Sequence, residues 1–125
     1  MADALAGRCR ARALGRAGLD LAERDCDAAL RGRRADGLLL ASRSLAHLAR
    51  GEPELAIADA DSALQTGERP FWALESRGLA ELGKGLQGAA RADLAAAAEV
   101  DAKQAERARK LGLAPQLDPV AAAAR

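Results

Sequence analysis

Residues 40–51 read LASRSLAHLARG, and residues 74–85 read LESRGLAELGKG. The two stretches match at leucine, serine, arginine, alanine and glycine positions, and a single shift aligns Leu40 with Leu74 and Gly51 with Gly85. Extending the comparison to residues 37–70 and 71–104 gives eleven identities, and residues 3–36 match residues 37–70 at nine places, mainly in the second half. Alanine richness alone would not bring leucine, arginine, glycine and aspartate into the same register. The chain therefore carries an internal repeat with a 34-residue period.

Each repeat reads as two helices joined by a short turn. In the second repeat, leucines at a helical period run up to a turn at Gly51 and Pro53, and the following helix ends before Gly67. The third repeat predicts helices over residues 71–84 and 89–100, with a glycine-rich turn between them. The pattern is therefore that of consecutive helical hairpins.

The composition also favours helices. The 125 residues include 34 alanines and 20 leucines, but only four β-branched residues and two aromatic ones. Alanine, leucine, arginine and glutamate are the best helix formers, whereas strands need β-branched and aromatic side chains. A single all-α domain is the fold class that this composition predicts.

Several classes of protein are excluded by the charge and the apolar runs. The net charge is +1, from 19 basic and 18 acidic residues, which argues against a nucleic-acid partner. The longest apolar runs, such as residues 94–98, are far shorter than a membrane span. No signal peptide is visible, so we expect a cytoplasmic protein, or a periplasmic one if a signal segment was removed. Two cysteines and one histidine cannot build a typical zinc site, and we expect no metal and no cofactor.

Small residues at fixed places within the repeats point to a family. Seventeen positions carry the pattern: Leu74, Gly78, Gly85, Ala90, Leu94, Ala97 and Asp101 in the third repeat, Leu40, Ser44, Gly51, Ala56, Ala60 and Ala63 in the second, and Ala22, Cys26, Ala29 and Leu30 in the first. The pattern resembles the tetratricopeptide repeat (TPR) family, in the form of a bacterial-type three-repeat array with a C-terminal capping helix.

The resemblance implies an α-solenoid of three helix-turn-helix hairpins over about residues 3–36, 37–70 and 71–104. A capping helix over about 103–112 would complete a domain of residues 1–112. We expect the proline- and alanine-rich residues 113–125 to form a disordered tail. The family's right-handed superhelix is part of what the resemblance implies.

The antiparallel pairing of helices within a hairpin predicts specific neighbours. Positions whose numbers sum to a constant face each other, so Gly78 should face Ala90 and Ser44 should face Ala56. Small side chains at these places let the backbones approach closely. The first repeat departs from the pattern, because Arg10 would lie opposite Ala22.

Charged residues that recur at the period are candidates for structural ion pairs. Arg43–Asp59 and Arg77–Asp93 should bridge paired helices, and Asp25 occupies the same place in the first repeat. The cluster of Arg31, Arg33 and Arg34 falls in a loop between repeats, where we expect a solvated turn rather than an anion site.

Two glycine motifs look like phosphate-binding loops, but their context contradicts this. Residues 78–84 spell G-x-x-x-x-G-K but lack the following serine or threonine, and residues 83–88 spell G-x-G-x-x-G. Both motifs need a preceding strand, and both fall in or next to a predicted helix. We interpret these glycines as part of the helical hairpin.

The histidine and the cysteines give no catalytic pattern. His47 occupies a helix-surface position taken by Glu81 in the next repeat, and we expect a packing or exposed role. Cys9 and Cys26 lie on paired helices of the first repeat. We expect buried thiols, while a disulfide is the alternative that the antiparallel pairing permits.

TPR proteins typically bind peptides or protein segments in a concave groove lined by the first helices. Carried over to this chain, the lining of that groove would be Leu38, Ala41, Ser42, Leu45, Leu48, Trp72, Glu75, Ser76, Leu79 and Leu82, with Ala4, Gly7, Arg8, Ala11 and Leu14 added by the first repeat. The basic clamp that one branch of the family uses for carboxylate termini is absent. An apolar groove with one tryptophan suits an amphipathic helix or an apolar peptide.

The sequence therefore predicts a non-catalytic protein–protein interaction module, monomeric or weakly self-associating, whose partner is a protein or peptide segment. Two alternatives stay open at this point. One is a structural module that forms homo-oligomers, and the other is an accessory part of a larger enzyme or complex.

Overall fold

The computed structural model describes residues 7–9, 11–12, 19–32, 36–67 and 70–110. Within these ranges every regular element is a helix, which confirms the all-α class. The helices are α2 (Leu19–Gly32), α3 (Gly37–Ala49), α4 (Pro53–Gln65), α5 (Phe71–Gly83), α6 (Gln87–Val100) and α7 (Ala102–Lys110), and residues 7–9 and 11–12 are helical as well. None of these helices is long and apolar enough to cross a membrane.

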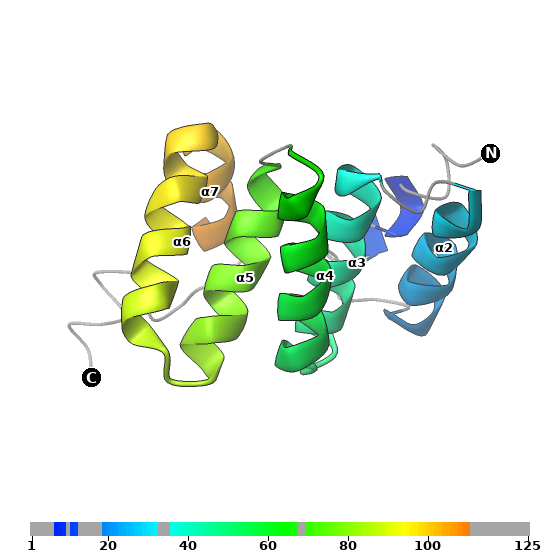
Figure 1. Cartoon of the computed structure of the whole chain (residues 1–125), viewed down its shortest axis with the longest axis horizontal. Coiled ribbons are helices and arrows are strands. Elements are labelled where there is room, and N and C mark those ends of the chain that lie inside the picture. Colours follow the sequence, from blue (N-terminus) through cyan, green and yellow to red (C-terminus); the bar gives the residue numbers. More distant parts are fainter. Residues whose placement is uncertain (1–6, 10, 13–18, 33–35, 68–69, 111–125) are drawn as a thin grey trace.

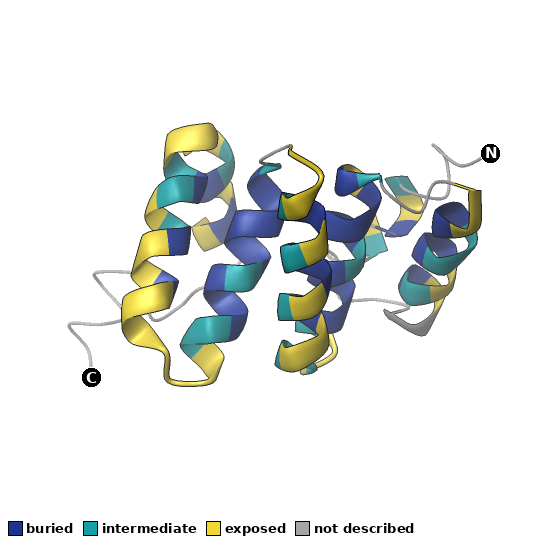
Figure 2. Cartoon of the chain, in the orientation of Figure 1, coloured by how far each residue is buried: buried dark blue, intermediate teal, exposed yellow. Residues whose placement is uncertain are grey.

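Helices that follow one another in the chain pack side by side. Figure 1 shows α2 to α6 arranged in order across the molecule, with α7 behind α6. The helix α3 packs on α4 and α5 on α6, while α2 contacts α3 and α4 contacts α5. Figure 2 shows α3 and α5 largely buried, whereas α4 and α6 expose one face. The core includes the fully buried Leu39, Leu45 and Leu74.

The helix ends follow from residues that the sequence places there. The Asp36 carboxylate accepts a hydrogen bond from the Leu39 N–H at 3.1 Å, which caps α3. Pro53 opens α4, and Asp101 accepts from the Gln104 N–H at 3.0 Å at the start of α7. Turn residue Gly51 has a φ of +77°, a backbone conformation that favours glycine.

The predicted helices of the third repeat are confirmed, with small differences in length. The helix predicted over residues 71–84 is α5, and the one over 89–100 is α6, which begins two residues earlier at Gln87. The predicted capping helix corresponds to α7, which is described as far as Lys110. The predicted tail lies outside the described residues.

The two cysteines form a disulfide, so the expectation of buried thiols was wrong in the bonding and correct in the burial. Cys9 and Cys26 are fully buried, and their Cα atoms lie 5.5 Å apart. This separation falls within the range of protein disulfides. The bond joins the short helical segment around Cys9 to α2.

Small residues lie where paired helices meet, and of the two predicted neighbour pairs Ser44–Ala56 is confirmed. The Ser44 hydroxyl donates to the Ala56 carbonyl of α4 at 2.7 Å. At Gly78, an added Cβ would lie 2.7 Å from Leu94 Cγ and 3.3 Å from Asp93 Cβ, one turn further along α6 than the predicted neighbour Ala90. A side chain at Gly78 therefore fits only if the Leu94 side chain or the helix α6 shifts.

Replacing Gly78 by leucine should lower the free energy of unfolding by about 1–3 kcal/mol, because the larger side chain overpacks the α5–α6 contact. Gly83 is a matched control on the same helix, since an added Cβ there meets nothing within 4 Å. Gly83→Ala should leave stability unchanged or raise it by up to about 1 kcal/mol through helix propensity. Thermal melting by circular dichroism measures both, and equal melting temperatures for the two variants would contradict the close contact at Gly78.

Candidate functional site

Arg43 joins three helices through its guanidinium group. Its Nε–H and one Nη2–H donate to the two carboxylate oxygens of Asp59 on α4, each at 2.8 Å. Its Nη1 donates to Asp27 on α2 at 2.9 Å. These contacts confirm the predicted Arg43–Asp59 bridge. The two carboxylates hold the pKa of Arg43 well above its ordinary value, although burial opposes the charge.

Arg77 repeats this arrangement one repeat later. It donates to both oxygens of Asp93 on α6 at 2.7 Å and to Asp61 on α4 at 3.0 Å. The Arg77–Asp93 bridge was predicted, but the contacts to Asp61 and to its counterpart Asp27 were not. Their recurrence at the 34-residue period was the available signal. Each arginine therefore binds one carboxylate within its own hairpin and one on the preceding helix.

In the first repeat, two arginines pair with Asp25, the aspartate that corresponds to Asp59 and Asp93. Arg12 donates to Asp25 at 2.7 Å, and Arg8 lies 3.4 Å from the other oxygen of the same carboxylate. Cys9 occupies the position that corresponds to Arg43. The recurring aspartate of the repeat thus keeps an arginine partner, although that partner comes from a different position.

His47 is buried between two carboxylates. Its Nδ1 lies 3.0 Å from Glu52 Oε1, and its Nε2 lies 3.5 Å from Asp59 Oδ2. The sequence suggested packing or exposure for His47 and missed both acidic partners. A hydrogen bond with His47 lowers the pKa of Glu52, with burial opposing and Arg50 assisting. No cysteine, serine or threonine is placed against the imidazole by the hydrogen bonds of the described residues.

His47 and two nearby carboxylates have the chemistry of metal ligands. Glu23, His47 and Glu52 each offer one ligand atom, and these atoms lie within 4.8 Å of one another. Arg50, however, lies between the two carboxylates: its Nη1 is 2.5 Å from Glu23 and its Nε is 3.4 Å from Glu52. A guanidinium already supplies the positive charge that a metal ion would bring. The cluster is best described as an ion-pair network.

In the next repeat, Glu81 takes the place of His47. Burial, a hydrogen bond with Asp93 and the negative charge of Asp93 hold the pKa of Glu81 well above its ordinary range. Burial alone would also raise the pKa of Asp93, but hydrogen bonds from Arg77 and Glu81 outweigh it and lower that pKa. A protonated Glu81 can donate to the ionised Asp93, whereas an ionised Glu81 leaves its buried Oε1 without a hydrogen bond.

Most of the predicted groove residues are buried. Leu38 is 47% exposed, and Leu48 and Leu82 are partly buried. The other seven are buried: Ala41, Ser42, Leu45, Trp72, Glu75, Ser76 and Leu79. In the first repeat, Arg8 and Ala11 are exposed and Gly7 is partly buried, whereas Ala4 and Leu14 lie outside the described residues. Binding on this face stays a prediction. Its accessible residues are Leu38, Leu48 and Leu82 in the second and third repeats and Gly7, Arg8 and Ala11 in the first.

The predicted anchor of the groove, Trp72, packs inside the molecule. Its ring meets the Phe71 ring edge-on, with centroids 4.9 Å apart. The neighbouring Glu75 is only 3% exposed, and burial raises the pKa of this carboxyl to about 7, with the charge of Arg109 opposing the shift. The sequence treated both residues as groove lining and gave no sign of their burial.

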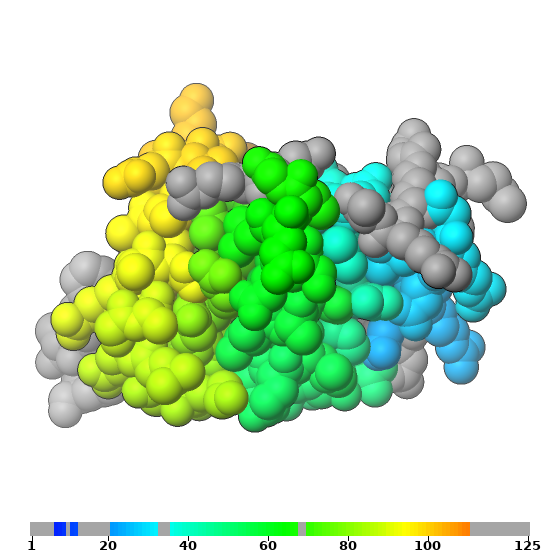
Figure 3. Space-filling view, in the orientation of Figure 1, coloured from blue at the N-terminus to red at the C-terminus, as the bar shows by residue number. Residues whose placement is uncertain are grey.

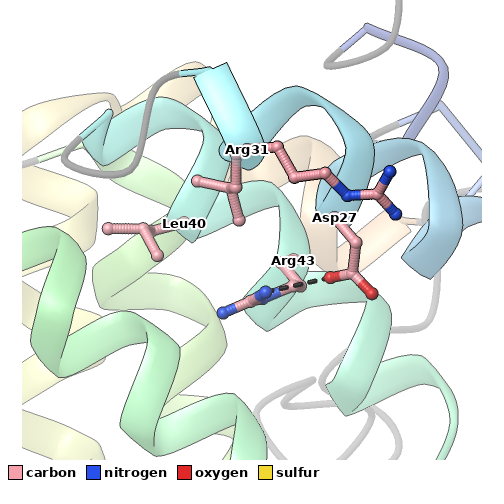
Figure 4. Close-up of a pocket in the computed structure, with 5 residues that line it drawn as sticks. Asp27, Arg31, Leu40 and Arg43 are labelled. Atoms are coloured by element: carbon pink, nitrogen blue, oxygen red, sulfur yellow. Dashed lines mark hydrogen bonds and ion pairs between the residues drawn. The ribbon is translucent and has the colours of Figure 1, made fainter.

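A pocket of about 460 Å³ lies between α2 and α3. It is lined by Asp27, Leu30, Arg31, Leu40 and Arg43. Figure 4 shows Asp27 joined to Arg43, the guanidinium of Arg31 above Asp27 in this view, and Leu40 on the opposite side. The expected loop position of Arg31 was wrong, because this residue lies in the last turn of α2. It is exposed, as a solvated residue would be, and it also lines this pocket. Arg33 and Arg34 lie outside the described residues.

Replacing Arg77 by methionine should lower the free energy of unfolding by about 1–3 kcal/mol, because it leaves the buried Asp93 carboxylate without its bidentate partner. Asp93→Asn in the same chain should restore part of the loss. Arg91→Met, at an exposed arginine of α6, should change stability by less than about 0.5 kcal/mol. Denaturant unfolding measures all three, and equal losses from Arg77→Met and Arg91→Met would refute a structural role for Arg77.

Stability should fall as the pH rises from about 5 to 8. The folded-state pKa of Glu75 is raised to about 7, so its contribution is fully present below the unfolded value of 4.5 and is lost as the pH passes 7. The raised pKa of Glu81 acts in the same direction. Glu75→Gln should remove part of this slope and melt higher than wild type at pH 8. Parallel melting-temperature curves for the two proteins would show that Glu75 is not the titrating group.

Compared with known proteins, the chain matches no family model, no curated protein and no solved structure. Any proposal about its function therefore rests on the sequence repeat and on the ion pairs of the structure.

Proposed function

We propose that this chain is a non-catalytic protein–protein interaction module built from tetratricopeptide-like repeats. Its partner would be a peptide or amphipathic helix that binds along the first helices, α3 and α5. The observation that carries the proposal is that the second and third repeats share the same arginine contacts and the same turn conformation. Arg43 and Arg77 make the same three contacts, and Gly51 and Gly85 both have φ near +80° in the turns that follow.

Recurrent geometry supports a repeat array, and a repeat array is typically used for binding. Stacked repeats bury one another's apolar faces and present an extended surface to a partner. On the predicted binding face, Leu38 is exposed and Leu48 and Leu82 are partly exposed. Leu38 lies in the first turn of α3, and Leu48 and Leu82 lie near the C-terminal ends of α3 and α5, so the accessible leucines are spread along these two helices. A partner helix that laid its apolar face along α3 and α5 could contact them.

The surroundings of the reactive side chains favour a role without catalysis. Cys9 and Cys26 are bonded to each other, so neither sulfur is a free thiolate. His47 lies between Glu52 and Asp59, two carboxylates, and this is an arrangement that fixes an imidazole in place. A general base also needs a nucleophile or a substrate proton within reach.

Self-association is a second candidate, and the outer surface favours it. Leu21 on α2 and Leu55 on α4 occupy the same place in successive repeats and are 46% and 50% exposed. Figure 3 shows α4 as a ridge along the middle of one face, with α2 and α3 beside it. Copies of the chain that met on this ridge would cover Leu55.

The proposal is tested by affinity capture from lysate with wild type, Leu38→Glu and Leu55→Glu as baits. Both leucines lie in the first turn of their helices, where glutamate is tolerated, so the two substitutions are matched. A protein recovered with wild type and Leu55→Glu but lost with Leu38→Glu is the expected result. Equal recovery with all three baits would place binding elsewhere. Concentration-dependent oligomers in light scattering that Leu55→Glu abolishes would favour self-association instead.

A further inference from the structure

Two adjoining pockets run along the seam between α2 and α3. The first holds about 460 Å³, and the second, lined by Glu23, Arg24, Asp27 and Arg50, holds about 270 Å³. The two share Asp27, so they form one site. We propose that this seam binds an acidic segment of a partner protein, in which carboxylate side chains flank an aliphatic one. The inference rests on the proposed function as an interaction module and adds the chemistry of the partner.

Most of the polar groups of the seam that lack a partner are N–H donors. Arg24 and Arg31 are exposed, and neither has a hydrogen bond or an ion pair in the part of the chain that the structure describes. A guanidinium carries five N–H donors, and Arg43 uses three of them on Asp59 and Asp27. Free guanidinium groups bind carboxylates with two parallel hydrogen bonds.

The acidic residues of the seam are already engaged by arginines of α3 and its C-terminal end. Arg43 holds Asp27, and Arg50 holds Glu23. Within each pair the arginine and the carboxylate neutralise each other, so the seam carries no large net charge from them. An anion would be attracted by the free N–H donors of Arg24 and Arg31. A partner would have to bring its carboxylates into hydrogen-bond range of both.

The next repeat forms the corresponding seam without these two arginines. The residues that correspond to Arg24 and Arg31 on α4 are Ala58 and Gln65, although Asp61 and Arg77 form the same ionic contact there. The α4–α5 seam therefore joins in the same way without the extra cations. Their presence on α2 alone points to a role beyond packing.

The apolar residues of the larger pocket indicate that the partner also carries an aliphatic side chain. Leu30 and Leu40 line it and are each 7% exposed, so they add a small apolar surface to a lining that otherwise consists of Asp27, Arg31 and Arg43. An aliphatic side chain of the partner would cover this surface while flanking carboxylates reach Arg31 and Arg24. A polar or basic segment would satisfy neither feature.

The test is selection of a random dodecapeptide phage library on the immobilised full chain. Wild type should enrich peptides with aspartate or glutamate beside leucine, isoleucine or valine. The most enriched peptide, synthesised with a fluorescein label, should bind Arg31→Ala about tenfold more weakly in fluorescence anisotropy and Arg24→Ala/Arg31→Ala more weakly still. Replacing its acidic residues by glutamine or asparagine should weaken binding to wild type to the same degree.

Arg91→Ala and Arg91→Ala/Arg107→Ala are the matched controls, because both residues are exposed arginines on other helices. They remove the same charge and should bind the labelled peptide as wild type does. Circular dichroism melting should be unchanged in all four variants, since alanine is a good helix former.

Two outcomes would overturn the inference. In the first, the enriched peptides show no preference for acidic residues. In the second, the Arg24/Arg31 and Arg91/Arg107 variants lose affinity equally, so that binding depends only on overall charge. Neither outcome touches the proposed function, because the lysate capture depends on Leu38, which lies outside both pockets.

Discussion

In the second and third repeats, a single guanidinium group fixes how three helices meet. Arg43 grips Asp59 on its hairpin partner with two parallel bonds and reaches back to Asp27 on the preceding helix with a third. The planar group sets distance and direction together, so the pairing within a hairpin and the stacking between hairpins depend on the same side chain. Lysine, a point charge on a flexible stem, could not define both geometries.

The arginines matter because most other side chains between the helices are small. Alanines such as Ala56, Ala60 and Ala63 are fully buried where α4 meets its neighbours, and they bring the backbones close. Close backbones bury the aspartates that face them, and a buried carboxylate is costly unless it is paired. Little aromatic packing is available, so the specificity that large side chains usually supply comes here from charge and geometry.

The sequence predicted what depends on local period and missed what depends on neighbours in space. The helices and the Arg43–Asp59 pair follow from the repeat and from antiparallel pairing within one hairpin. The Asp27 contact crosses to another hairpin, which that pairing rule does not describe. The partners of His47 were hidden because its counterpart in the next repeat is Glu81, which carries a different chemistry. Burial is compatible with a thiol and with a disulfide, so it gave no warning that the expectation of thiols at Cys9 and Cys26 was wrong.

The three-contact arginine also gives the chain a direction. Residues 37–70 present an arginine backward, to Asp27, and a carboxylate forward, from Asp61 to Arg77. The two ends of such a unit are complementary, because the arginine at one end fits the carboxylate at the other end of the preceding unit. In the third repeat the place of Asp61 is taken by Ala95, so α6 offers no forward carboxylate at that position. Copies of residues 37–70 inserted before Phe71 would keep every arginine–aspartate contact between neighbouring units. Copies added after α6 would lack the carboxylate that their first arginine needs.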